Sequence, residues 1–105
     1  MALVMAMLAG LAIPSAGCVQ EAPRTHRVRI TDMRFTPSTL VVRPGDSVQW
    51  VNEDLVPHTV TSRASGIDSG TIPPGGDWRW TAREPLTMPY TCALHPTMTA
   101  RLDVR

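Results

Sequence analysis

The residues best suited to chemistry lie in one short segment near the C-terminus. Cys92, His95 and Met98 follow one another at intervals of three, and a further imidazole, His58, follows a proline far upstream. Two His, one Cys and one weakly held axial Met are the donors of a copper site built on a trigonal plane of two nitrogens and a sulfur. These donors suit an ion that alternates between Cu(I) and Cu(II). We therefore predict a metal centre that carries single electrons.

Three other uses of the same donors are open at this stage. A periplasmic chaperone or sequestering module could bind copper through the same side chains. Zinc could bind tetrahedrally in a structural or hydrolytic role, although the Irving–Williams order favours copper. A copper enzyme of the nitrite-reductase or multicopper-oxidase kind would need further ligands, and only His26 remains among the histidines. We therefore expect a carrier rather than an enzyme.

The N-terminal segment resembles an export signal. Residues 1–13 contain no charged side chain and are mostly Ala, Leu, Val and Met. This run is shorter than the roughly 20 apolar residues that a membrane-spanning helix needs, and it fits the core of a secretory signal. Small residues precede Cys18, as in a lipoprotein signal. We predict a signal over residues 1–17, a location in the bacterial periplasm, and either lipidation at Cys18, which would anchor the protein to the membrane, or simple release. An ordinary buried helix is the alternative.

Cysteine use and charge limit the remaining classes. Cys92 has no disulfide partner if Cys18 is removed or lipidated, and an unpaired thiol in an oxidising compartment needs something to occupy it. The alternative is a disulfide between these two cysteines. The net charge is +1, and the ten basic residues, all Arg, are mixed with acidic residues. This pattern argues against nucleic-acid binding.

The rest of the chain must position these donors, and its pattern is that of short strands. After a linker over residues 18–25, residues 26–105 form a single domain in which apolar and polar residues alternate with period two. The expected strands cover 26–30, 40–42, 48–52, 58–62, 78–80, 88–92 and 102–104. Turn signals such as Pro44-Gly45-Asp46 separate them. Seven to eight such strands predict an all-β sandwich or barrel.

The inward positions of these strands give the expected core. Its members are Val28, Ile30, Val42, Val48, Trp50, Val60, Trp80, Tyr90 and Val104. We also assign Met33 and Met88 to the core and give His26 no ligand role. With His58 at the start of a strand, Cys92 at the end of another, and His95 and Met98 in the loop before the last strand, the four donors should meet at one pole of the sandwich.

Several segments together carry a resemblance to a known family. They are Met33-x-Phe35-x-Pro37, Pro44-Gly45-Asp46-x-Val48-x-Trp50-x-Asn52, Pro57-His58-x-Val60 and Tyr90-x-Cys92-x-x-His95-Pro96-x-Met98. The chain resembles the cupredoxins, which are type 1 blue copper proteins, and among them the amicyanin group. That group also has two residues between the second His and the Met.

The resemblance implies a Greek-key β-sandwich that binds one type 1 copper ion through His58, Cys92, His95 and Met98. It also suggests that Asn52 links the two ligand-bearing loops. The implied activity is electron transfer between exported redox proteins that dock near His95, such as an amine dehydrogenase and a c-type cytochrome. We expect a monomer.

Overall fold

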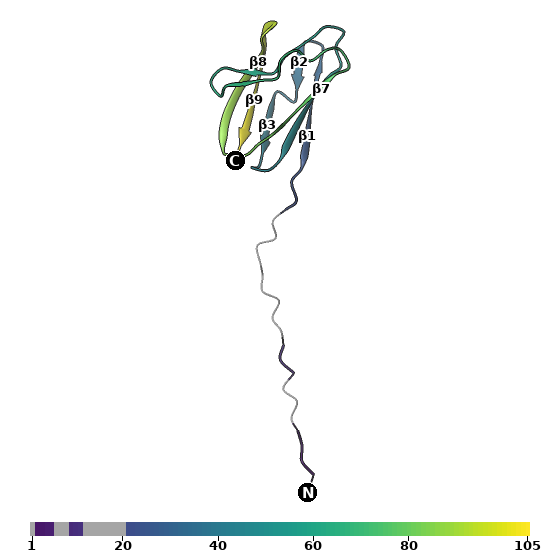
Figure 1. The fold of residues 1–105 in the computed structure, drawn as a ribbon, viewed down its shortest axis with the longest axis vertical. Helices are drawn as coiled ribbons and strands as arrows, with labels where there is room; N and C mark the ends of the chain where they lie inside the picture. Colours follow the sequence, from purple (N-terminus) through teal and green to yellow (C-terminus); the bar gives the residue numbers. More distant parts are fainter. Residues whose placement is uncertain (1, 6–8, 12–20) are drawn as a thin grey trace.

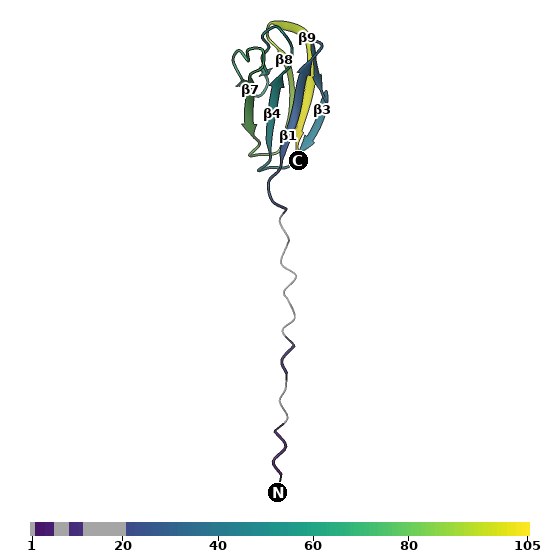
Figure 2. The same cartoon turned by 90° about the vertical axis from the view of Figure 1, so that its right-hand side faces the viewer.

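A computed structural model describes residues 2–5, 9–11 and 21–105, and within them it places a sandwich of two β-sheets (Figures 1 and 2). Nine strands are assigned in the described part of the chain. They are β1 (Thr25–Thr31), β2 (Arg34–Thr36), β3 (Thr39–Val42), β4 (Ser47–Asn52), β5 (Thr61–Ser62), β6 (Ile67–Asp68), β7 (Asp77–Thr81), β8 (Leu86–Cys92) and β9 (His95–Val104). The predicted all-β class is confirmed.

The chain changes sheet repeatedly, as the predicted Greek-key sandwich requires. One sheet has the order β2-β1-β4-β7 and the other the order β3-β9-β8-β5-β6. Strands β1 and β4 pair in parallel, as do β3 and β9, whereas the remaining pairs are antiparallel. The parallel pairs join segments distant in sequence, so these contacts fix which strand ends meet at each pole.

The core lies between the sheets and contains nearly all of the predicted residues. Of the nine strand residues expected at inward positions, all except Trp80 are at most 3% exposed. Trp50 is central, because its indole N–H donates to the Tyr90 hydroxyl at 3.2 Å and its ring meets the Tyr90 ring edge-on. Phe35 packs against the other side of this cluster, with its ring centroid 4.8 Å from that of Tyr90. Burial raises the pKa of Tyr90 to about 12.

Two core predictions were wrong or only partly right. Met88 is buried, but Met33 is 40% exposed, because it lies in the two-residue turn between β1 and β2 with a φ of 59°. A residue at a hairpin tip has no sheet above it to cover its side chain. Trp80 is only partly buried, because β7 is at the edge of its sheet.

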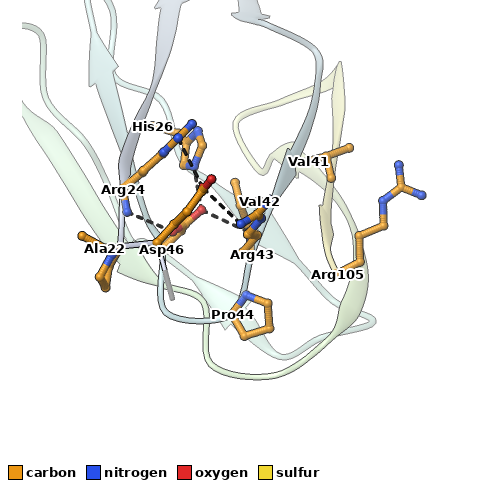
Figure 3. A pocket seen from close by; sticks show the side chains of 11 residues that line it. Ala22, Arg24, His26, Val41, Val42, Arg43, Pro44, Asp46 and Arg105 are labelled. Carbon is orange, nitrogen blue, oxygen red and sulfur yellow. Dashed lines mark hydrogen bonds and ion pairs between the residues drawn. The ribbon is translucent and has the colours of Figure 1, made fainter. Parts of the chain in front are cut away.

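The end of the sandwich where β1 begins is held by one carboxylate (Figure 3). Asp46 Oδ1 accepts a hydrogen bond from the Arg24 N–H at 2.9 Å. Its Oδ2 accepts one from the Arg43 N–H at 3.1 Å and lies 2.9 Å from His26 Nε2. The side chain of Asp46 is 9% exposed. This residue therefore joins the start of β1 to the turn between β3 and β4.

The described residues of the predicted signal are in no regular element. Leu3, Val4, Met5 and Leu11 are between 87% and 95% exposed, so at these positions the interpretation as a buried helix is contradicted. Cys18 lies outside the described residues. In the part of the chain that the structure describes, no helix is long and apolar enough to cross a membrane.

Candidate metal centre

Cys92 and His95 lie on either side of the tight turn that joins β8 to β9. The strand ladder pairs them directly, and it next pairs Thr91 with Thr99. Residues 96–98 on β9 therefore have no partner in register, which makes this part of the hairpin irregular. Pro96 favours the irregularity, because proline has no N–H for a ladder hydrogen bond.

This hairpin corrects one sequence expectation. His95 and Met98 were expected in a loop before the last strand, but β9 already begins at His95. Irregular stretches of this kind redirect side chains at functional sites. Here the irregular stretch contains Met98 and begins directly after His95.

His58 comes from a distant part of the chain but lies beside Cys92 and His95. It lies between β4 and β5 and forms an isolated bridge with Ile72 rather than part of the longer strand that we expected over 58–62. Its side chain is fully buried. His58 Nδ1 lies 3.7 Å from Cys92 Sγ, and His95 Nδ1 lies 3.6 Å from the same sulfur. The donor atoms of these three residues all lie within 4.8 Å of one another.

Met98 also faces the interior. Its side chain is 4% exposed and belongs to the same buried cluster as Cys92. It stands three residues beyond His95 in the irregular part of β9. A buried thioether at this end of the sandwich is available as the weak fourth donor that the sequence predicts.

The donor chemistry fits a copper ion. Cys92 is a free thiol that is fully buried, and two imidazole nitrogens lie beside its sulfur. Thiolate, imidazole and thioether are donors for copper or zinc, not for Mg²⁺ or Ca²⁺, which take oxygen ligands. The set of two His, one Cys and one Met is therefore compatible with one type 1 copper ion.

Two side chains that sequence reasoning did not assign support the donors. Asp54 Oδ2 lies 2.7 Å from His58 Nε2, on the ring atom opposite the one that faces the sulfur. The pKa of Asp54 is below its ordinary value: burial raises it, but hydrogen bonds from the Met33 N–H, the His58 ring and the Asp32 N–H outweigh burial. The only feature of the sequence that pointed to Asp54 was its position four residues before the candidate ligand His58.

Thr59 links the two ligand-bearing segments, which is the role that the resemblance also suggests for Asn52. Its N–H donates to Cys92 Sγ at 3.3 Å, and its hydroxyl accepts from the Ala93 N–H at 2.8 Å. The Asn52 side-chain amide instead donates to the carbonyls of Val56 and Ile72, so it orders the segment that carries His58. Thr59 directly follows His58 in sequence, but its role becomes visible only through its contacts with Cys92 and Ala93 in the folded protein.

The surface around the site is apolar. Leu55 is 94% exposed, Leu94 is 51% exposed and Val56 is 40% exposed, whereas His95 is half-buried. Leu94 lies in the turn next to His95, and the other two lie in the segment leading to His58. We call Leu55, Val56 and Leu94 the apolar rim. Exposed apolar side chains gathered at one site are typical of interaction surfaces.

Known proteins share this sequence and this arrangement of strands. Amicyanin-alpha of Methylorubrum extorquens (strain ATCC 14718 / DSM 1338 / JCM 2805 / NCIMB 9133 / AM1) is 28% identical over 102 residues, which cover 91% of this chain and 86% of that protein. A solved structure of an amicyanin variant in its oxidised state is 27% identical, with a TM-score of 0.74 over 77% of this chain and 82% of that chain.

A larger enzyme shares the fold alone. The copper-containing nitrite reductase of Thermus scotoductus SA-01 is 22% identical, with a TM-score of 0.73 over 87% of this chain but 24% of that chain. The sequence profile described as copper binding proteins, plastocyanin/azurin family, matches residues 24–105, which is most of the chain. Together with the cluster of His58, Cys92 and His95, this match shows that the chain belongs to the plastocyanin/azurin family of copper-binding proteins, with amicyanin among its similar relatives.

Proposed function

We propose that this protein is a one-electron carrier that works between exported redox proteins. The observation that supports it most is the cluster in which the Cys92 sulfur lies 3.7 Å and 3.6 Å from the Nδ1 atoms of His58 and His95. Copper bound there would supply the Cu(I)/Cu(II) couple. His58, Cys92, His95 and Met98 would hold that ion through two imidazole nitrogens, a thiolate and a thioether.

The chain's own residues hold these donors still. A carrier works fastest when the ligands move little between oxidation states, and this requires a stiff site. Pro57 and Pro96 fix the backbone φ beside the two His ligands. Thr59 ties the two ligand-bearing segments together through its contacts to Cys92 and Ala93.

The edge of His95 is the proposed route for electrons. His95 is half-buried, so the residue is partly accessible beside the apolar rim. A small apolar surface permits brief contacts, which a carrier that exchanges partners needs. The likeness to amicyanin suggests an amine dehydrogenase and a c-type cytochrome as partners, with the carrier acting as a monomer without a substrate of its own.

Export to the bacterial periplasm is part of the proposal. The uncharged apolar run over residues 1–13 supports a signal, with cleavage before Cys18 and a lipid on that residue as the membrane-anchored form. The full exposure of Leu3 and Leu11 is consistent with a segment that does not contribute to the core. A periplasmic carrier would receive electrons from other exported proteins.

A visible absorption spectrum of the copper-loaded protein tests the site. We expect an intense band from the thiolate–copper bond in the oxidised protein, which reduction removes and reoxidation restores. Cys92→Ser should abolish the band, and Cys18→Ser is the matched control because it removes the other thiol of the chain. A coloured Cys92→Ser protein would refute the assignment.

The same preparation separates the carrier from a copper chaperone. A carrier keeps its copper through repeated reduction and oxidation, which metal analysis after each cycle measures. Rapid transfer of copper to a competing acceptor, fast enough to deliver the metal, would favour the chaperone instead. The full burial of Cys92 and His58 supports retention, because release needs an accessible site.

A further inference from the structure

One carboxylate stands behind the buried ligand His58. Asp54 Oδ2 lies 2.7 Å from His58 Nε2, and the Asp54 side chain is 14% exposed. The two Asp54 oxygens already accept the N–H groups of Asp32 and Met33, so the carboxylate acts as an acceptor and the ring nitrogen is the donor. A neutral imidazole has a single N–H. If that proton is on Nε2, then Nδ1 carries a lone pair, and Nδ1 is the atom that lies 3.7 Å from Cys92 Sγ.

Two backbone N–H groups hold the carboxylate, and a third hydrogen bond holds the backbone of Asp54. The N–H groups of Asp32 and Met33 donate to Asp54 Oδ1 at 2.8 Å and to Oδ2 at 3.0 Å. The Asp54 N–H donates to the Asn52 side-chain oxygen at 3.0 Å. Both oxygens therefore have fixed partners, and the carboxylate cannot rotate freely away from His58.

The turn that holds Asp54 has an unusual backbone. Asp32 and Met33 have φ values of 52° and 59°, which are uncommon for residues other than glycine. They form the two-residue connection between β1 and β2, where such left-handed pairs match the twist of the strands. In this conformation both N–H groups point at one carboxylate, which offsets part of the backbone strain.

We propose that Asp54 is the positioning residue of the metal centre: it fixes the ring orientation and the tautomer of His58 so that Nδ1 is free to bind the metal, and the β1–β2 turn holds it there. This inference rests on the proposed function, since it takes His58 as a ligand. A carboxylate or carbonyl that accepts the second ring N–H of a ligating His raises the basicity of the ligand. Loss of such partners typically lowers metal affinity by about 10- to 100-fold.

Two variants test the proposal. Asp54→Asn keeps the size of the side chain but puts an amide N–H₂ group in place of one oxygen, and Asp54→Ala removes both acceptors. Glu53→Gln is the matched control, because Glu53 is the adjacent acid and bonds Arg29 on the surface, with Nη2 to Oε2 at 2.6 Å. Each variant is made in the full-length chain.

The first measurement is made without metal. Nitrogen-15 NMR of the histidine rings, at about pH 8 where an ordinary imidazole is neutral, should show His58 as the Nε2–H tautomer in the wild type and in Glu53→Gln. Both Asp54 variants should shift it toward Nδ1–H. A wild-type His58 protonated on Nδ1, or an unchanged tautomer in both variants, would overturn the proposal.

The second measurement is a Cu(II) titration of the same proteins with a competing chelator. We expect about 10- to 100-fold weaker binding in the Asp54 variants and unchanged binding in Glu53→Gln. If Asp54 only stabilised the turn, the variants would unfold at lower denaturant but bind Cu(II) as tightly while folded, which would contradict the proposal. A wild-type protein that bound no copper would instead refute the proposed function, and the tautomer would still be decided by NMR.

Discussion

Replacing Asp46 with asparagine should remove the part of the acid-range pH dependence of stability that comes from this carboxylate. In the folded protein, the Arg24 N–H, the His26 ring and the Arg43 N–H bond the Asp46 carboxylate, and they lower its pKa from 3.8 to about 2. Because the side chain is 9% exposed, solvent screens these contacts only weakly. The carboxylate lies at the end where β1 begins, whereas the His58–Asp54 pair meets the turn at the other end of β1, so the change leaves the site intact.

The magnitude follows from the size of the pKa shift. Each pKa unit corresponds to about 1.4 kcal/mol, so a shift from 3.8 to about 2 stabilises the folded state by roughly 2 kcal/mol when Asp46 is ionised. The folded pKa is the lower one. The contribution is therefore complete above 3.8 and is lost as the pH falls through about 2.

Chemical denaturation at fixed copper loading measures the contribution of Asp46 to the free energy of unfolding. Unfolding free energies of the wild type and Asp46→Asn, taken in steps between about pH 2 and pH 5, should differ by roughly 2 kcal/mol more at the upper end than at the lower end. Glu84→Gln, which changes an exposed acid, should follow the wild type. Parallel curves for the wild type and Asp46→Asn would show that the three contacts do not stabilise the ionised carboxylate.

Three further predictions concern the site and the core. Thr59→Val should lower the unfolding free energy by about 1–2 kcal/mol, because the Ala93 N–H loses its acceptor. Thr59→Ser keeps the hydroxyl and should have the unfolding free energy of the wild type. Equal stability of all three proteins would contradict a stabilising hydrogen bond between Thr59 and Ala93. Ser62→Ala should raise stability by about 1 kcal/mol in urea unfolding, because the buried Ser62 Oγ has no hydrogen-bond partner among the described residues; a clear loss of stability would reveal a partner. Met98→Leu should keep the copper and raise the reduction potential in voltammetry, because the thioether donor that favours Cu(II) is gone. An unchanged potential would mean that Met98 is not the axial ligand.

Strand pattern explains which parts of the fold were predictable. Long strands with one buried face, such as β1, β4 and β8, alternate regularly, and their inward residues were assigned correctly. The short edge strands β2 and β6 were not predicted, because two or three residues are too few to show a period. Met33 was misassigned because hydrophobicity alone does not reveal that a residue lies at a hairpin tip with a left-handed backbone.

The supporting residues of the site were harder to predict than the donors. Donor types are chemically distinctive, so His58, Cys92, His95 and Met98 stand out in the sequence. Threonine and aspartate are common in loops for many reasons. Their roles depend on contacts across the sandwich: Thr59 bonds Cys92, 33 residues away, and Asp54 bonds the turn that begins 22 residues before it.

The donor chemistry, the period-two faces and turns such as Pro44-Gly45-Asp46 could be identified from the sequence, because they are properties of neighbouring residues. The contact between His58 and Cys92 across a separation of 34 residues, and the hairpin turn that holds the carboxylate behind His58, follow from the folded arrangement. Those contacts depend on which strand ends are brought to one pole. The parallel pairing of β1 with β4 and of β3 with β9 helps to fix that choice, and local periodicity carries no information about pairing partners.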